Sequence, residues 1–169
     1  MNDTKTPVIA VVVPCYKVER HLEGVLTSVP QTVRHIIVVD DACPNSSGKI
    51  AEALQSKDER IVTLFHPANR GVGGAVITGY QHALSLSSDI VVKMDGDGQM
   101  DPAQVPQLVE PLVAGRADYA KGNRFRNFDE LRQMPRLRLV GNSFLSFFLK
   151  AASGYWNLMD PSNGYTAIQ

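Results

Sequence analysis

Residues 90–99 are Ile90-Val91-Val92-Lys93-Met94-Asp95-Gly96-Asp97-Gly98-Gln99, and they join a strand pattern to a pair of acidic residues. Its first part is an apolar, β-branched run, which predicts a buried strand, and its second part sets two carboxylates at the end of that strand. A glycine after each aspartate leaves the backbone free to curl, so both carboxylates and the amide oxygen of Gln99 can converge on one hard cation. We therefore predict a Mg²⁺ or Mn²⁺ site at Asp95, Asp97 and Gln99, with positions open for water and phosphate oxygens.

The same string also fits a turn with solvated charges, and for an isolated pair of aspartates that interpretation is the stronger one. An EF-hand loop that starts at Asp95 is excluded, because its fifth, sixth and twelfth positions are Gln99, Met100 and Pro106. The metal site therefore depends on what the rest of the sequence places around it.

The composition is that of an ordinary globular domain. Of 169 residues, 44% are hydrophobic and 20% are charged, which argues against a disordered chain. The 17 basic and 17 acidic residues balance, so no overall field favours nucleic acid as a partner. The segment 116–138 nevertheless carries a net charge of +4, so basic charge gathers after the predicted metal site.

Neither a secretion signal nor a membrane span is visible in the sequence. The N-terminal residues contain no apolar signal core, and no run approaches the roughly 18 apolar residues of a spanning helix. We therefore expect a cytoplasmic protein. Cys15 and Cys43 show neither zinc-site spacing nor a CxxC pattern, so we expect both to be reduced packing residues.

Apolar runs alternate with helical patterns along the chain. The runs predict strands at 8–13, 35–39, 61–65, from 90 onward and, more briefly, at 118–122; helical patterns lie between them, and a last helix covers 137–152. This alternation predicts an α/β fold with a mainly parallel sheet and right-handed crossovers. Because ligands bind beyond the carboxyl ends of such strands, we expect one crevice to gather Asp40, Asp41, Asn69 and Asp95.

A glycine-rich segment, Gly71-Val72-Gly73-Gly74-Ala75, opens one of the predicted helices. It is neither a dinucleotide fingerprint, because Val76 stands where Gly or Ala is needed, nor a P-loop, because Gly-Lys-Ser/Thr is absent. Small residues here permit close helix packing or close approach of a ligand, and we expect packing to be their main role.

In this order the segments resemble family 2 of the glycosyltransferases, inverting enzymes of the GT-A fold, and most of all its polyprenyl-phosphate group, the dolichol-phosphate mannose synthase type. The matching segments cover nearly the whole chain and are Pro14 to Tyr16, Asp40-Asp41, Asn69 to Ala75, Asp95 to Pro102, Gly122 to Phe125 and Asp160 to Tyr165. The chain departs from the family pattern at Lys17, which replaces Asn, and at Ala42-Cys43, which replace Gly-Ser.

The resemblance implies a nucleotide-sugar donor and a metal. Contacts to the donor nucleotide would come from Pro14, Tyr16, Glu19, Asp40, Asp41 and Asp95. The metal, held by Asp95, Asp97 and Gln99, would neutralise charge that grows on the leaving diphosphate, which gives Asp97 a catalytic part. Asp160 matches the position proposed for a catalytic base in this group, and a supporting role for it is nearly as well founded.

The resemblance also implies a lipid-linked acceptor. Arg124 and Arg138 would bind the acceptor phosphate, because the guanidinium fork pairs with two phosphate oxygens. We expect a single GT-A domain over 1–169 that stops mid-pattern, and thus a truncated chain whose full-length form works at the cytoplasmic face of a membrane.

The expected activity is transfer of a hexose from a UDP- or GDP-sugar to a polyprenyl phosphate, with inversion at the anomeric carbon. Two alternatives stay open at the level of sequence. One is a family 2 enzyme that glycosylates a glycan hydroxyl during surface-polysaccharide synthesis in the cell envelope. The other is a non-catalytic module that binds a nucleotide sugar.

Overall fold

A computed structural model describes residues 6–123, 147–152, 154 and 163–169 of the chain. The chain divides into two compact units, Met1–Ala120 with Tyr165–Gln169, and Lys121–Gly164. In the second unit, residues 147–152 are helical, which is the end of the helix predicted at 137–152; the rest of that helix lies outside the described residues. No helix within the described ranges is long and apolar enough to cross a membrane.

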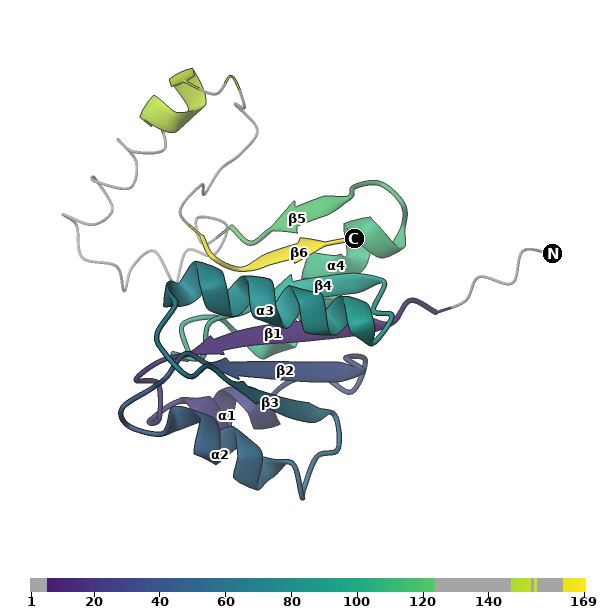
Figure 1. The fold of residues 1–169 in the computed structure, drawn as a ribbon. Helices are drawn as coiled ribbons and strands as arrows, with labels where there is room; N and C mark the ends of the chain where they lie inside the picture. Colours follow the sequence, from purple (N-terminus) through teal and green to yellow (C-terminus); the bar gives the residue numbers. More distant parts are fainter. Residues whose placement is uncertain (1–5, 124–146, 153, 155–162) are drawn as a thin grey trace. The chain divides into compact units, whose positions relative to one another are not determined.

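The first unit is built on a six-stranded sheet with the order β3-β2-β1-β4-β6-β5 (Figure 1). The strands are β1 (Ile9–Cys15), β2 (His35–Asp40), β3 (Ile61–Phe65), β4 (Ile90–Lys93), β5 (Tyr119–Lys121) and β6 (Thr166–Ile168). Strand β1 pairs in parallel with β2 and β4, and β2 pairs in parallel with β3. The predicted α/β fold with a mainly parallel sheet is thus confirmed, but the sequence did not indicate β6, which runs antiparallel to β4.

Helices cover both faces of this sheet. Helix α3 (Gly71–Ser85) packs on one face, and α1 (Leu22–Thr27), α2 (Ser47–Leu54) and α4 (Val105–Val113) contribute to the core on the other. Strand β1 shows why: Val11 and Val13 point into the larger core, whereas Ala10 and Val12 point toward α3, and all four are fully buried. A strand with no solvated face has room for charged side chains only at its ends.

Gly79 lets α3 lie close to the sheet. A Cβ atom at this position would collide with Cγ1 of Val12, so any larger residue would push the helix away from β1. By contrast, a Cβ on Gly71 or Gly73 would meet nothing within 4 Å. Our expectation that the glycines at the start of α3 serve mainly for packing is therefore wrong at these two positions; Gly71 instead has a φ of +75°, which favours glycine.

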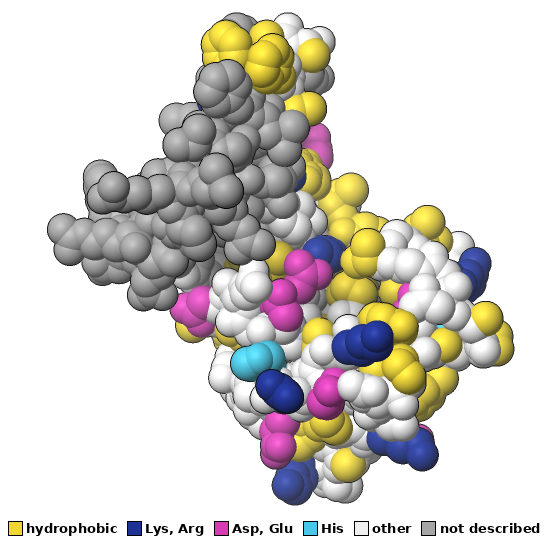
Figure 2. Space-filling view, turned by 90° about the vertical axis from the view of Figure 1, so that its left-hand side faces the viewer, with side chains coloured by type: hydrophobic (Ala, Val, Ile, Leu, Met, Phe, Trp, Pro, Cys, Tyr) yellow, Lys and Arg dark blue, Asp and Glu magenta, His cyan; other side chains and the backbone are white. Residues whose placement is uncertain are grey.

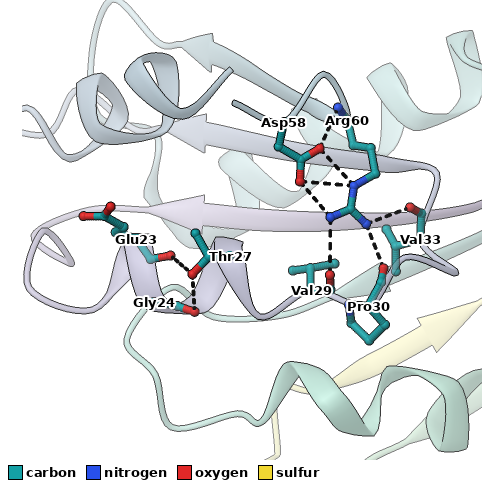
Figure 3. A network of polar contacts seen from close by, with 8 residues as sticks. All are labelled: Glu23, Gly24, Thr27, Val29, Pro30, Val33, Asp58 and Arg60. Carbon is teal, nitrogen blue, oxygen red and sulfur yellow. Dashed lines mark hydrogen bonds and ion pairs between the residues drawn. The ribbon is translucent and has the colours of Figure 1, made fainter. Parts of the chain in front are cut away.

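At the amino ends of β2 and β3, Arg60 connects two loops through hydrogen bonds (Figure 3). Its guanidinium donates to the carbonyl oxygens of Pro30 at 2.8 Å, Val33 at 3.2 Å and Val29 at 3.3 Å. It also forms a two-pronged pair with Asp58, at 2.9 and 2.7 Å. The side chain of Arg60 is only 15% exposed, so these contacts replace water around a charged group and fix the start of β3 against the segment before β2.

We expect Arg60→Met to lower the free energy of unfolding by about 2–4 kcal/mol, because three carbonyl oxygens and Asp58 lose a charged donor. Urea unfolding measures the loss. The matched control is Arg34→Met, which changes an exposed arginine just before β2. Equal small losses in the two variants would contradict this role for Arg60.

The pH dependence of unfolding provides a second test of the pairing between Arg60 and Asp58. The hydrogen bonds from Arg60 hold the pKa of Asp58 below its usual range, so the folded chain binds this proton less readily than the unfolded chain. The stabilisation is then complete above the unfolded-state pKa of about 4 and is lost as the pH falls through the folded-state pKa. The difference between the wild type and Arg60→Met should therefore shrink in strong acid.

Candidate functional site

A cleft of about 390 Å³ opens at the carboxyl ends of the parallel strands. Figure 2 looks onto this side of the molecule, toward which β1 and β2 run in Figure 1, and acidic, basic and hydrophobic side chains are interspersed on it. Three structural parts supply the walls: the ends of β1, β2 and β4, the loop after β3, and the first turn of α3. The lining residues are Pro14, Cys15, Tyr16, Val18, Asp41, Asn69, Gly71, Val72, Ala75, Asp95, Gly96 and Asp97.

The structure brings several predicted site residues together here. Pro14 and Tyr16 lie on one wall, and Tyr16 keeps 43% of its surface exposed. The Nζ of Lys17 lies 5.3 Å from the centre of the Tyr16 ring. Asp41 and Asn69 also line the cleft, so three of the four polar residues expected in one crevice, these two and Asp95, do meet. Asp40, the fourth, is not among the lining residues.

The predicted metal-binding stretch turns into the cleft directly after β4. Met94 is fully buried and anchors the turn, while Asp95 and Asp97 line the cleft. The backbone N–H of Gln99 donates to Oδ1 of Asp97 at 3.0 Å, and the Gln99 side chain is exposed and is not among the lining residues. The ammonium of Lys93 lies 2.5 Å from Oδ1 of Asp95.

These residues fit a hard divalent cation that keeps an open coordination sphere. Within the described part of the chain, no group of three or more His, Cys, Asp or Glu side chains is placed to hold a metal. Two carboxylates at the mouth of a cleft are nevertheless enough for Mg²⁺ or Mn²⁺, because such ions take their remaining ligands from water and phosphate.

Asp40 is buried and holds a loop in place. Its Oδ1 accepts the N–H of Cys43 at 2.7 Å, and its Oδ2 accepts the N–H of Gly48 at 2.6 Å. A Cβ on Gly48 would lie 2.6 Å from Oδ2 of Asp40, so the start of α2 can approach the carboxylate only because residue 48 is glycine. Glu19 serves the same loop, since its Oε1 accepts from the side chain of Asn45 at 2.7 Å. That Asp40 and Glu19 also contact the nucleotide of the sugar donor stays a prediction.

The two departures from the family pattern after β2 still produce a tight turn. Ala42, where the pattern has glycine, adopts a φ of +54°, in the left-handed region that costs energy for a residue with a Cβ. Cys43, where the pattern has serine, accepts the N–H of Lys17 with its Sγ at 3.1 Å and contacts the hydroxyl of Ser47 at 3.1 Å. The thiol thus joins the β1 turn to the start of α2.

A second buried carboxylate, Asp41, connects the end of β2 to the end of β3 and to α3. Its side-chain partner is His66, which the sequence did not indicate as a site residue. Oδ1 of Asp41 lies 2.7 Å from Nδ1 of His66 and accepts the N–H of Arg70 at 2.8 Å. The other ring nitrogen of His66 lies 2.9 Å from the hydroxyl of Thr78 on α3. Burial alone raises the pKa of Asp41, but the N–H of Arg70 and the His66 side chain outweigh it and hold that pKa below its usual range.

The register of the sheet explains why His66 reaches Asp41. Asp40 pairs with Phe65 across β2 and β3, so the residues that directly follow these two strands, Asp41 and His66, are neighbours at the same edge. This is the signal that could have identified His66 from the sequence. Three other predicted site residues, Arg124, Arg138 and Asp160, lie outside the described residues.

Comparison with known proteins adds sequence relatives of known activity. The family model described as Glycosyl transferase family 2 matches residues 10–169. The chain is 30% identical over 173 residues to the UDP-N-acetylglucosamine–dolichyl-phosphate N-acetylglucosaminyltransferase of Methanococcus voltae, covering 95% of this chain and 68% of that protein. It is 31% identical to the polyprenol monophosphomannose synthase of Mycolicibacterium smegmatis, covering 94% of this chain and 60% of that enzyme.

A solved structure shows the same fold. Glucosyl-3-phosphoglycerate synthase from Mycobacterium tuberculosis, in complex with Mn²⁺, UDP-glucose and phosphoglyceric acid, superposes with a TM-score of 0.71 at 23% identity. The match covers 96% of this chain and 56% of the synthase. The chain thus spans between about half and two thirds of the length of these three proteins.

We expect His66→Phe to lower the free energy of unfolding by about 2–4 kcal/mol, because the buried carboxylate of Asp41 loses its side-chain partner. Thr78→Val, which removes only the outer hydroxyl of the same network, should cost about 0.5–1.5 kcal/mol. Urea unfolding of both variants beside the wild type measures the two values. If the phenylalanine variant were as stable as the valine variant, the pairing of Asp41 with His66 would contribute nothing specific.

Proposed function

Because the chain belongs to glycosyltransferase family 2, we propose that it carries the donor-binding part of an enzyme that moves a hexose from a UDP- or GDP-sugar to a polyprenyl phosphate, with inversion. The observation that carries the proposal is the meeting of an exposed aromatic ring, Tyr16, and two carboxylates, Asp95 and Asp97, in one cleft. An aromatic face suits a nucleoside base, and carboxylates suit the metal of a diphosphate. One sequence relative is named for transfer to dolichyl phosphate and the other for synthesis of polyprenol monophosphomannose, which supports the lipid acceptor.

The nucleoside end of the donor would lie against the β1 turn. Tyr16 offers its ring for stacking, and the ammonium of Lys17 lies 5.3 Å from the ring centre, where a cation is attracted to the aromatic face. The carboxylate of Asp41, already held by His66 and Arg70, is positioned to accept from a hydroxyl group. Glu19 and Asp40 would act on the nucleoside through the loop that they hold, or by direct contact as the resemblance implies.

The diphosphate would lie between the turn after β4 that carries Asp95 and Asp97, the acidic turn, and the first turn of α3. Asp95 and Asp97, with Gln99 as the third predicted ligand, would hold Mg²⁺ or Mn²⁺; when bound, the ion neutralises charge on the leaving diphosphate. Gly71, Val72 and Ala75 put the first turn of α3 on the facing wall, where the helix dipole favours negative charge. Metal and helix would thus hold the diphosphate from two sides.

The acceptor needs positioning more than activation. A phosphate oxygen is already anionic, so a base such as Asp160 is optional, and charged donors that orient the acceptor matter more. We assign that task to Arg124 and Arg138 on the basis of the sequence, where they lie in the segment of net charge +4. An acceptor with a lipid tail would place the full-length protein at the cytoplasmic face of a membrane.

Metal dependence is the first test of this proposal. We expect UDP or GDP to bind the chain at least about tenfold more tightly with Mn²⁺ than with EDTA, and Asp97→Asn to remove most of that gain. Isothermal titration measures both affinities. The matched control is Asp118→Asn, the same chemical change at an exposed aspartate just before β5, and it should keep the gain. Equal binding in Mn²⁺ and in EDTA would refute the metal assignment.

The acceptor assignment has a separate test. In the double variant Arg124→Ala, Arg138→Ala of the full-length enzyme, we expect donor affinity to hold while the KM for polyprenyl phosphate rises or kcat collapses. The reason is that each charge-assisted hydrogen bond to phosphate contributes about 1.5–3 kcal/mol. A loss of donor affinity with an unchanged KM for the acceptor would instead move these arginines to the donor and favour a glycan hydroxyl as acceptor.

A further inference from the structure

The two aspartates of the acidic turn have different surroundings. Lys93, the last residue of β4, points its ammonium at Asp95, with 2.5 Å between Nζ and Oδ1. The Lys93 side chain is 13% exposed and that of Asp95 33% exposed, so the pair is partly withdrawn from water. Asp97, by contrast, takes part in no ion pair within the described ranges, and its Oδ1 accepts a backbone N–H from Gln99.

This difference matters for any cation that enters the cleft. A cation that binds Asp95 must compete with Lys93 for Oδ1 and is also repelled by the ammonium, because both carry positive charge. At Asp97, no ion pair among the described residues competes with a cation for the carboxylate oxygens. The ammonium of Lys93 instead attracts an anion that binds near Asp95.

The charges of the cleft lead to the same distinction. Three carboxylates line it, those of Asp41, Asp95 and Asp97, and Lys93 compensates one of them. Asp41 is in turn paired with His66 at 2.7 Å, so among the described residues Asp97 is the cleft carboxylate without an ion-pair partner. The positive charge of Lys93 also offsets part of the negative charge that an arriving diphosphate meets.

We propose that Lys93 is a positioning residue that gives Asp95 and Asp97 different roles in the acidic turn. It holds Asp95 in place and offsets its charge, it leaves Asp97 as the main ligand of the metal, and it supplies a fixed positive charge near the diphosphate. The inference rests on the proposed function, because it assumes that a metal and a nucleoside diphosphate share this cleft. Lys93 thus weakens metal binding and strengthens diphosphate binding at the same time.

The test is Lys93→Met, which removes the charge and keeps most of the side-chain length. We expect the variant to bind Mn²⁺ alone about tenfold more tightly than the wild type, as measured by the electron paramagnetic resonance signal of free Mn²⁺. At saturating Mn²⁺ it should bind UDP or GDP about tenfold more weakly, as measured by calorimetry. Binding of uridine or guanosine, which carry no phosphate, should not change.

Three further variants sharpen the test. Lys93→Gln should show the same two opposite shifts, which guards against poor folding of the methionine variant. Lys93→Arg keeps the charge and should keep both affinities near the wild-type values. Lys57→Met removes an exposed lysine from the loop before β3, at the other edge of the sheet, and should change neither affinity.

The outcomes separate this inference from the proposed function. A wild type whose binding of UDP and GDP does not depend on Mn²⁺ overturns both. A wild type that shows metal-dependent binding, with Lys93 variants that lose both affinities together or change neither, overturns the inference alone. A merely structural role for Lys93 would weaken Mn²⁺, diphosphate and nucleoside binding in parallel, so opposite shifts support the charge-based role.

Discussion

The site depends on a single constraint, the burial of both faces of the central parallel strands. Strand β1 has neighbours on both sides and helices above and below, and its side chains from Ala10 to Val13 are fully buried. Charged side chains would cost several kcal/mol inside such a layer, so they follow the strands instead. Because the strands are parallel, the residues that follow them meet at one edge, and this edge forms the cleft.

Two buried carboxylates at this edge give the cleft its shape, in different ways. Asp40 accepts backbone N–H groups from the loop after β2 and from the start of α2, while Asp41 connects β2 to β3 and α3 through His66 and Thr78. Each replaces the water that a carboxylate would otherwise need. Asp41 holds the start of α3 through the N–H of Arg70, and the loop held by Asp40 carries Cys43, whose Sγ accepts the N–H of Lys17 next to Tyr16. The packing of the fold is thus linked to the walls of the cleft.

Local sequence predicted much of the fold and part of the site. Continuous apolar runs identified β1 to β4, and the rule that parallel strands end at one edge brought Asp41, Asn69 and Asp95 together correctly. The sequence did not indicate strand β6, because Thr166–Ile168 is too short for a periodic pattern and pairs with β4, which is far away in the chain. The hydrogen bonds of Asp40 and the contact of Gly79 with Val12 depend on distances between elements, which no local pattern encodes.

We propose that one cleft at the strand ends binds metal and diphosphate together. A crystal of the chain grown with Mn²⁺ and UDP or GDP, with data collected at the manganese absorption edge, tests it most directly. We expect an anomalous peak beside the carboxylate of Asp97, with the diphosphate between that peak and the first turn of α3, and the base against Tyr16. Nucleotide bound at another surface, or bound in this cleft with no manganese beside Asp97, would contradict it.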